Sequence, residues 1–125
     1  MTAVLDAGAL IGIDSRDRTV GALLRVLQAG RIDVRTSAGA AAQVWRDGSR
    51  QAALARALQG IDSVALDDAA SRSVGALLRT SGTADVIDAH VALLVPAGGQ
   101  VLTSDVDDLT VLLRARRVEA TVVRV

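Results

Sequence analysis

The chain of 125 residues has no cysteine, lysine, phenylalanine or tyrosine, and only one tryptophan and one proline. Without cysteine there is no disulfide, no thiolate nucleophile and no zinc–sulfur site. With so few aromatic residues the core must consist of Ala, Val, Leu and Ile, which suits helices packed on a sheet of β-branched strands. Acidic and basic residues balance at 14 each, so no gross basic field indicates a nucleic-acid partner.

Long apolar runs are also missing. None approaches the roughly 18–20 residues that a membrane span requires. The opening segment MTAVLDAGALIGID carries Asp6 early and has no basic leader, so it indicates a first strand rather than a signal peptide. The length is typical of one domain, residues 1–125, and we expect a cytoplasmic protein without a membrane anchor.

Strand-like and helix-like segments alternate along the chain. Short apolar or alternating runs at 2–6, 31–37, 61–67, 100–104 and 120–125 predict strands. Helical spacing of apolar residues and helix-ending glycines predict helices over 7–13, 19–30, 38–48, 49–60, 68–80 and 105–117, and one within 81–99. This alternation predicts an α/β fold, a parallel sheet with helices on both faces.

Acidic residues follow the first and fourth predicted strands. If these strands are neighbours where the strand order reverses, Asp6 and Asp105 face the crevice in which such sheets bind ligands. The helix before the fourth strand begins at the same edge, and it carries Asp85 and Asp88 three residues apart on one face. Asp108 lies in the first turn of the helix after Asp105. We therefore expect five carboxylates on one rim.

Each of these residues also has a simpler interpretation as a helix cap. Asp6 and Asp105 precede predicted helices, Asp105 with Asp108 forms a weakened capping box, and Asp85 lies in a first turn, where the helix dipole favours an anion. Capping, however, does not require that the residues meet in space. Several unpaired carboxylates packed together would have raised pKa values, whereas Mg²⁺ or Mn²⁺ requires such hard oxygen ligands. The set as a whole therefore predicts a divalent-metal site.

Four segments together resemble the PIN-domain family, and more narrowly the VapC-type ribonuclease toxins of bacterial toxin–antitoxin pairs. They are VLDAGALI, TSAGAAAQVWR, SGTADVIDAHVALL and VLTSDVDDL, and they cover nearly the whole chain in the family's order. The resemblance implies a three-layer α/β/α fold with a five-stranded parallel sheet, a site for Mg²⁺ or Mn²⁺, and metal-dependent cleavage of RNA. It also implies a cognate antitoxin as partner and a homodimer.

On this resemblance Asp6, Asp88 and Asp105 are the catalytic acids, and the ion that they hold activates water for attack on the phosphodiester. Ser104 corresponds to a small hydroxyl residue that helps to orient the site. The acids expected to hold the metal are Asp6, Asp85, Asp88, Asp105 and Asp108.

Gln43 departs from the family pattern, in which a glutamate usually stands on the helix after the second strand. Glutamine keeps an oxygen donor but loses the charge, so a second metal would be held more weakly. Under one hypothesis, the extra carboxylate of Asp85 compensates for the charge that is lost at Gln43. Under the alternative, the chain is a catalytically weak PIN scaffold that acts as an RNA- or protein-binding regulatory module.

Three further residue patterns bear on the function. Arg46 is the preferred basic residue for an RNA phosphate. His90 lies two residues after Asp88, on a different helix face, which favours a structural role over that of a base. Response-regulator receivers and haloacid-dehalogenase-type phosphatases also place an aspartate after their first strand, but both rely on a lysine, which this chain lacks.

Overall fold

Five parallel strands form one sheet, in the order β3-β2-β1-β4-β5, in the computed structural model, which describes residues 1–125. The predicted α/β fold with a five-stranded parallel sheet is therefore confirmed. The third strand is shorter than predicted and lies at the sheet edge. The strands span Thr2–Leu5 (β1), Asp33–Ser37 (β2), Asp62–Val64 (β3), Gln100–Thr103 (β4) and Thr121–Arg124 (β5).

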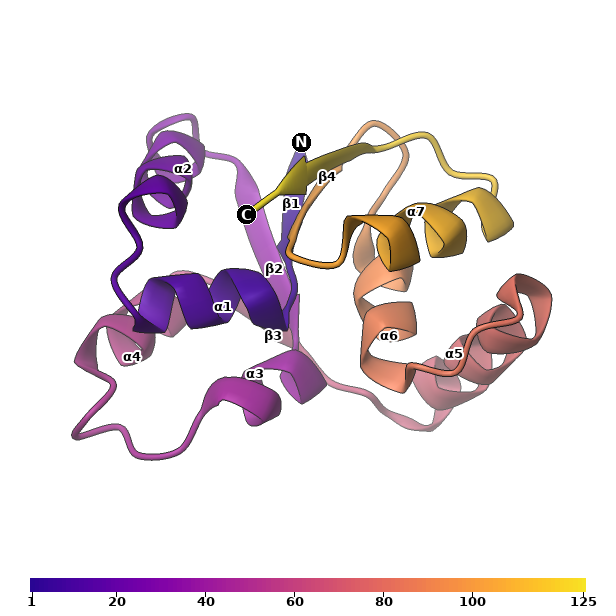
Figure 1. The fold of residues 1–125 in the computed structure, drawn as a ribbon, viewed down its shortest axis with the longest axis horizontal. Coiled ribbons are helices and arrows are strands. Elements are labelled where there is room, and N and C mark those ends of the chain that lie inside the picture. The colour runs from indigo at the N-terminus through magenta and orange to yellow at the C-terminus, as the bar shows by residue number, and fades with distance from the viewer.

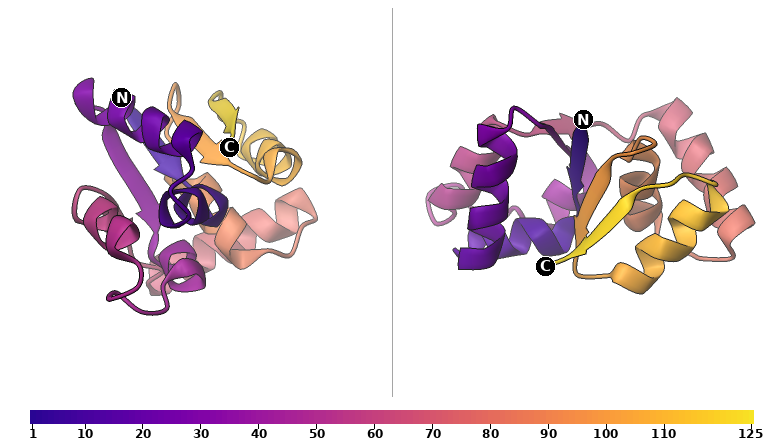
Figure 2. Two further views of the ribbon diagram at one scale, coloured as in Figure 1. Left: turned by 60° about the vertical axis from the view of Figure 1, so that its left-hand side comes forward. Right: turned by 90° about the horizontal axis from the view of Figure 1, so that it is seen from above.

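Seven helices cover the two faces of this sheet. The helices α1 to α4 pack with one another on one face, and α5 to α7 pack together on the other (Figure 1). The view from above separates the same two layers, with the sheet between them (Figure 2). The helices span Ala7–Asp14 (α1), Arg18–Ala29 (α2), Ala38–Val44 (α3), Ala52–Gln59 (α4), Asp68–Ser81 (α5), Val86–Leu94 (α6) and Val106–Ala115 (α7).

The strand order explains this division of the helices. The chain moves from β1 through β2 to β3 in one direction, then crosses back to β4 and β5 on the other side of β1. Crossovers between parallel strands are right-handed, so a reversal of direction transfers the helices to the opposite face. The order reverses between β1 and β4, the position at which such sheets generally bind ligands.

The neighbouring strands β1 and β4 are almost entirely buried. Every residue of β1 is buried, and so are three of the four residues of β4. Strands covered on both faces need continuous apolar sequence rather than alternation, which AVL in β1 and VL in β4 supply. Leu5 lies opposite Leu102 in the parallel register, and the backbone N–H of Asp6 donates to the Leu102 carbonyl at 3.1 Å. The side chains that end both strands are therefore held side by side.

The helix after β2 ends at Val44, four residues before the predicted end at Gly48. The alanine-rich sequence favours a longer helix, but the side chain of Gln51 prevents it. Its carbonyl oxygen accepts from the backbone N–H of Arg46 at 2.6 Å, and its amide group donates to the Val44 carbonyl at 2.9 Å. A tertiary contact thus replaces the next turn of helix, which local propensity does not reveal.

A buried hydrogen bond joins the two helical layers across the sheet edge. The hydroxyl group of Ser37 lies 2.6 Å from Nδ1 of His90, which is only 2% exposed. Burial lowers the pKa of His90 and so favours the neutral ring, which shares one hydrogen bond with the Ser37 hydroxyl group through Nδ1. Ser37 also accepts from the backbone N–H of Gly39 as the cap of α3. His90 is accordingly a structural residue of α6, as its place in the sequence indicates.

No helix has the length and apolar character needed to cross a bilayer.

Replacing Ser37 with Ala should destabilise the fold. The change removes the cap of α3 and leaves Nδ1 of His90 buried without a partner, a combined loss of about 2–4 kcal/mol in the free energy of unfolding. Urea unfolding measures this loss. Ser73→Ala, at an exposed position of α5, is the matched control and should change stability little. Equal stabilities of the two variants would contradict the structural role of the Ser37–His90 contact.

Candidate metal centre

Three carboxylates meet beside the carboxyl ends of β1 and β4. Asp88 comes from the first turn of α6, Asp105 from the residue before α7, and Asp108 from the first turn of α7. One oxygen atom of each lies within 4.8 Å of the others, close enough for one cation to contact all three. We call Asp88, Asp105 and Asp108 the acidic cluster.

Asp6 lies at the end of β1 and is held more rigidly than the acidic cluster. It is only 3% exposed, and both of its carboxylate oxygens are hydrogen-bonded. One accepts from the backbone N–H of Ala9 at 2.9 Å, and the other accepts from the hydroxyl group of Thr103. The charge of Asp6 raises the pKa of Asp88, and that of Asp105 raises the pKa of Asp6, so the four carboxylates share one electrostatic environment.

Thr103 connects Asp6 to the acidic cluster, a role that the sequence reasoning missed. Its hydroxyl group donates to Asp6 and accepts from the backbone N–H of Asp105 at 2.8 Å. The sequence prediction assigned the orienting hydroxyl to Ser104, which the structure places on the exposed surface. The parallel register contained the signal: with Leu5 opposite Leu102, the next pair is Asp6 with Thr103. Ser104 follows the end of β4, and its side chain packs against Gly8 in the first turn of α1.

The capping interpretation holds for two of the five aspartates. Asp6 caps α1, and Asp85 caps α6 by accepting from the backbone N–H of Asp88 at 2.8 Å. Asp105 stands at the cap position of α7, but its side chain makes no capping hydrogen bond. Asp108 likewise lies in the acidic cluster rather than in a capping box with Asp105. Capping thus leaves the carboxylates of the acidic cluster unexplained.

Burial and mutual repulsion both act on Asp88. They raise its pKa from 3.8 to about 7, chiefly through loss of hydration and then through the charges of Asp85, Asp105, Asp6 and Asp108. One of its oxygens, Oδ2, is buried and has no hydrogen-bond partner. Burial likewise raises the pKa of Asp6, although hydrogen bonds from Thr103 and from backbone N–H groups oppose the shift. The site is therefore short of positive charge.

The chemistry of these residues fits a divalent cation. All the side chains that converge are carboxylates, the ligand type that Mg²⁺ and Mn²⁺ prefer. The unpartnered Oδ2 atom of Asp88 is a buried acceptor without a donor, which a native fold rarely tolerates. A cation among the carboxylates would satisfy this atom and remove the repulsion that raises the pKa of Asp88.

Two further residues of the predicted site, Asp85 and Gln43, lie outside the acidic cluster. Asp85 is exposed and acts on Asp88 through its charge and its cap. Gln43 is exposed on α3, one turn beyond Gly39, whose missing side chain leaves room for Ile87 of α6. Gln43 therefore occupies the face of α3 that looks toward α6.

Arg46, the predicted RNA contact, is engaged within its own loop. It donates from one guanidinium nitrogen to the carbonyl groups of Ala42 and Trp45, at 3.1 and 2.6 Å. These bonds satisfy carbonyls at the end of α3. The remaining guanidinium N–H groups are exposed, and RNA binding by Arg46 stays a prediction.

Gly8 allows the two halves of the site to approach. A Cβ atom there would lie 2.7 Å from the Cβ of Ser104 and 3.2 Å from its backbone nitrogen, which is too close for any side chain. The first turn of α1 therefore packs directly on the segment between β4 and α7. This contact keeps Asp6 beside Asp105.

No protein-family model matches the chain, and no curated protein sequence matches it either. The domain with sheet order 3-2-1-4-5 and an acidic cluster at its carboxyl edge is nevertheless consistent with a PIN-like fold.

Replacing Asp88 with Asn should remove the loss of stability that this carboxyl group causes as pH rises. A carboxyl group whose pKa is raised by folding holds a proton that the unfolded chain has released, so the folded state loses stability as pH rises from 3.8 to about 7. In a chelating buffer above neutral pH, Asp88→Asn should be more stable than the native chain by about 1–2 kcal/mol, after allowance for solvent screening. Near the lower end of this range the two should be equal. Urea unfolding across this pH range measures the difference, and an advantage independent of pH would contradict the shifted pKa.

Replacing Gly8 with Ala should weaken the metal centre. Helix propensity alone predicts that Ala stabilises α1 by up to about 1 kcal/mol, but the clash with Ser104 displaces Asp6 from Asp105. We expect affinity for Mn²⁺, measured by calorimetry, to fall about tenfold, as for other changes that misplace a ligand. Ser104→Gly in the same chain should restore it.

Gly75→Ala is the matched control, since no atom lies within 4 Å of a Cβ added there. Equal Mn²⁺ affinities for Gly8→Ala and Gly75→Ala would show that the close contact does not shape the site.

Proposed function

We propose that the protein is an endoribonuclease that depends on Mg²⁺ or Mn²⁺, of the type found as the toxin of a toxin–antitoxin pair. The observation that carries the proposal is the buried, unpartnered Oδ2 atom of Asp88 within the acidic cluster. Such an atom supports a divalent cation as ligand, and the acidic cluster lies at the carboxyl edge of the sheet, where parallel sheets generally bind substrates. The resemblance of the sequence to VapC-type toxins supplies RNA as the substrate.

The proposed division of roles follows from how each side chain is held. Asp88, Asp105 and Asp108 would hold the ion, and Asp6, fixed by Thr103 and Ala9, would contribute its charge from beneath. When bound there, the ion would supply a Lewis acid for a phosphate oxygen and lower the pKa of the attacking water. Asp85 would position Asp88 by capping α6.

The centre contains no histidine base and no cysteine or base-activated serine nucleophile. The only histidine, His90, is buried, neutral and bonded to Ser37, so it does not reach a substrate. The exposed hydroxyl group of Ser104 has no base beside it except carboxylates. Hydrolysis by water is therefore the reaction that these residues fit best.

A nuclease of this kind would need an inhibitor in the cell. We extend the proposal to a cognate antitoxin that covers the acidic rim, and to a homodimer as the assembled form. A guanidinium group from the antitoxin would match the excess negative charge of the acidic cluster, which raises the pKa of Asp88.

The second candidate is a catalytically weak scaffold that binds RNA or protein. Gln43 favours it, because a neutral amide stands where the related nucleases usually have a carboxylate. In that case the acidic cluster would bind an ion that stabilises the fold without supporting catalysis.

Cleavage of labelled RNA in the presence of Mn²⁺ tests the proposal. The native protein should cut, and Asp88→Asn or Asp105→Asn should reduce the rate about a hundredfold or more, since each removes a proposed metal ligand. Asp107→Asn is the matched control: it removes an exposed carboxylate from the same turn of α7, outside the acidic cluster, and should leave the rate nearly unchanged.

The result with Gln43→Glu separates the two candidates. If the native protein cuts no RNA and this variant does, the scaffold function is favoured over the nuclease.

A further inference from the structure

The carboxylates of the proposed metal centre would repel the phosphate groups of a bound RNA. Five carboxylates gather there, and one divalent ion neutralises only part of their charge. The chain as a whole has no net charge. A polyanion is therefore not attracted to the metal centre itself, and its affinity must come from a positive region elsewhere on the surface.

Few arginines of the chain are free for such a role and also close together. Arg35 and Arg50 are ion-paired with Asp33 and Asp47. Arg46 and Arg116 donate to backbone carbonyls at the ends of helices. Among the remaining arginines, four gather around one hollow.

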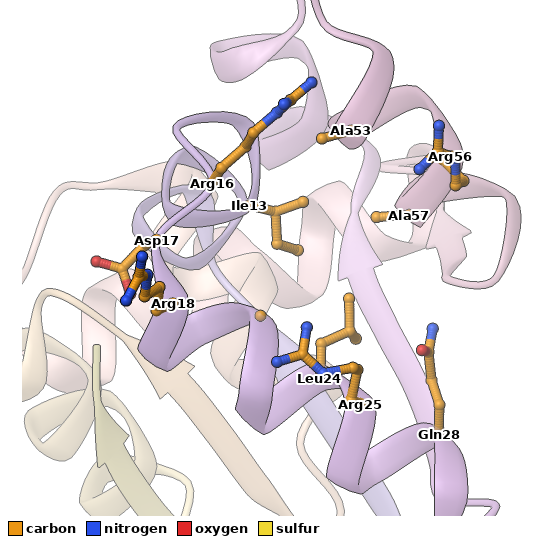
Figure 3. A pocket seen from close by; sticks show the side chains of 11 residues that line it. Ile13, Arg16, Asp17, Arg18, Leu24, Arg25, Gln28, Ala53, Arg56 and Ala57 are labelled. Carbon is orange, nitrogen blue, oxygen red and sulfur yellow. The ribbon is translucent and has the colours of Figure 1, made fainter.

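This arginine hollow lies between the end of α1, one side of α2 along its length, and α4. Its volume is about 530 Å³. Ile13 and Leu24 form its floor, and arginine side chains surround them on several sides (Figure 3). The residues that line it are Ile13, Arg16, Asp17, Arg18, Gly21, Leu24, Arg25, Gln28, Ala53, Arg56 and Ala57.

The charge of the arginine hollow is strongly positive. Its four arginines, Arg16, Arg18, Arg25 and Arg56, are exposed, and none forms an ion pair. Asp17 is the only acidic residue of the lining, and one of its oxygens accepts from the backbone N–H of Val20 as the cap of α2. Guanidinium groups bind phosphate with paired hydrogen bonds and stay charged at all accessible pH values.

The arginine hollow and the metal centre lie at opposite ends of one helix. Asp6 immediately precedes α1, and Arg16 follows its last residue by two positions. The eight residues of α1 span about 12 Å at 1.5 Å per residue. A single strand of a few nucleotides bridges such a distance. No aromatic side chain lines the hollow, so it suits phosphate groups better than stacked bases.

We propose that the arginine hollow is a second binding site for RNA, which holds backbone phosphates a few nucleotides from the scissile bond. This inference rests on the proposed function for the identity of the polyanion. It assigns to the hollow most of the affinity for RNA, and to the metal centre the cleavage. RNA that reaches both sites should bind more tightly than RNA that reaches only one.

Binding of labelled single-stranded RNA to the Asp88→Asn protein, in chelating buffer over a range of salt concentrations, tests the proposal without cleavage. The double variant Arg16→Gln, Arg56→Gln in this background should lower the slope of log affinity against log salt by about 1.4, at about 0.7 for each lost phosphate contact. If the two binding curves converge near 1 M salt, this slope corresponds to about 25-fold weaker binding near 0.1 M.

Two control variants separate a specific site from net charge. Arg79→Gln, Arg124→Gln removes the same charge from exposed positions on α5 and β5 and should leave the slope unchanged. Arg16→Lys, Arg56→Lys keeps the charge and should retain most of the slope. Equal slopes for the two glutamine double variants would overturn the proposal.

Competing ligands give the other decisive outcomes. If a glutamate-rich peptide binds the native hollow and loses affinity in the glutamine variant while RNA does not, the occupant is an acidic protein and the proposal is wrong. If a single nucleotide competes as well as the long RNA, the site serves a small phosphate compound, and the proposal is again wrong.

The cleavage assay keeps the two proposals apart. If the native protein cuts no RNA but the glutamine double variant binds RNA more weakly, the RNA site stands and the nuclease proposal is wrong. If the native protein cuts RNA and the glutamine double variant leaves the salt slope unchanged, the nuclease proposal stands and the second RNA site is wrong.

Discussion

Repulsion among carboxylates at the carboxyl edge of the sheet is the constraint that shapes this molecule. Asp88, Asp105 and Asp108 lie within contact distance of one another, and Asp6 is buried beside them. Loss of hydration on burial and, after it, mutual repulsion raise the pKa values of Asp6 and Asp88, and both effects oppose folding. The packing of the two central strands and the helices on them must supply the free energy that keeps the carboxylates in place. Natural folds tolerate such an arrangement where function requires it.

Three contacts oppose the dispersal of these charges. The hydroxyl group of Thr103 joins Asp6 to the backbone of Asp105, so the two strand ends cannot separate. The absence of a side chain at Gly8 lets α1 pack directly on the next segment. Asp85 holds the first turn of α6 and thereby the position of Asp88. These contacts position the carboxylates in the absence of an ion, and such preorganisation would reduce the cost of binding one.

The sequence predicts the fold and the neighbourhood of the site, because both depend on patterns that repeat along the chain. Alternating strands and helices specify a parallel sheet, and aspartates after strands one and four specify the edge at which they meet. The role of Thr103 could not be predicted in the same way, because it depends on the register of β1 against β4. A shift of one residue would give that role to Ser104.

The end of α3 and the arginine hollow could not be predicted from the sequence either, because both depend on contacts between separate segments. Helix propensity extends α3 to Gly48, but Gln51, a residue of the next segment, ends it at Val44. The arginines of the hollow come from two separate stretches, around Arg16 and at Arg56, each of which looks like an ordinary solvated helix face. Only the packing of α4 against α1 brings them to one place.

The connection between Thr103 and Asp6 spans 97 positions of the chain. Contacts of such long sequence separation form only when the overall topology is in place. A nascent chain still on the ribosome, with β1 to β3 already made, therefore lacks both β4 and the acidic residues after it. The acidic cluster therefore comes together only late in synthesis, after β4 and the residues that follow it have been made.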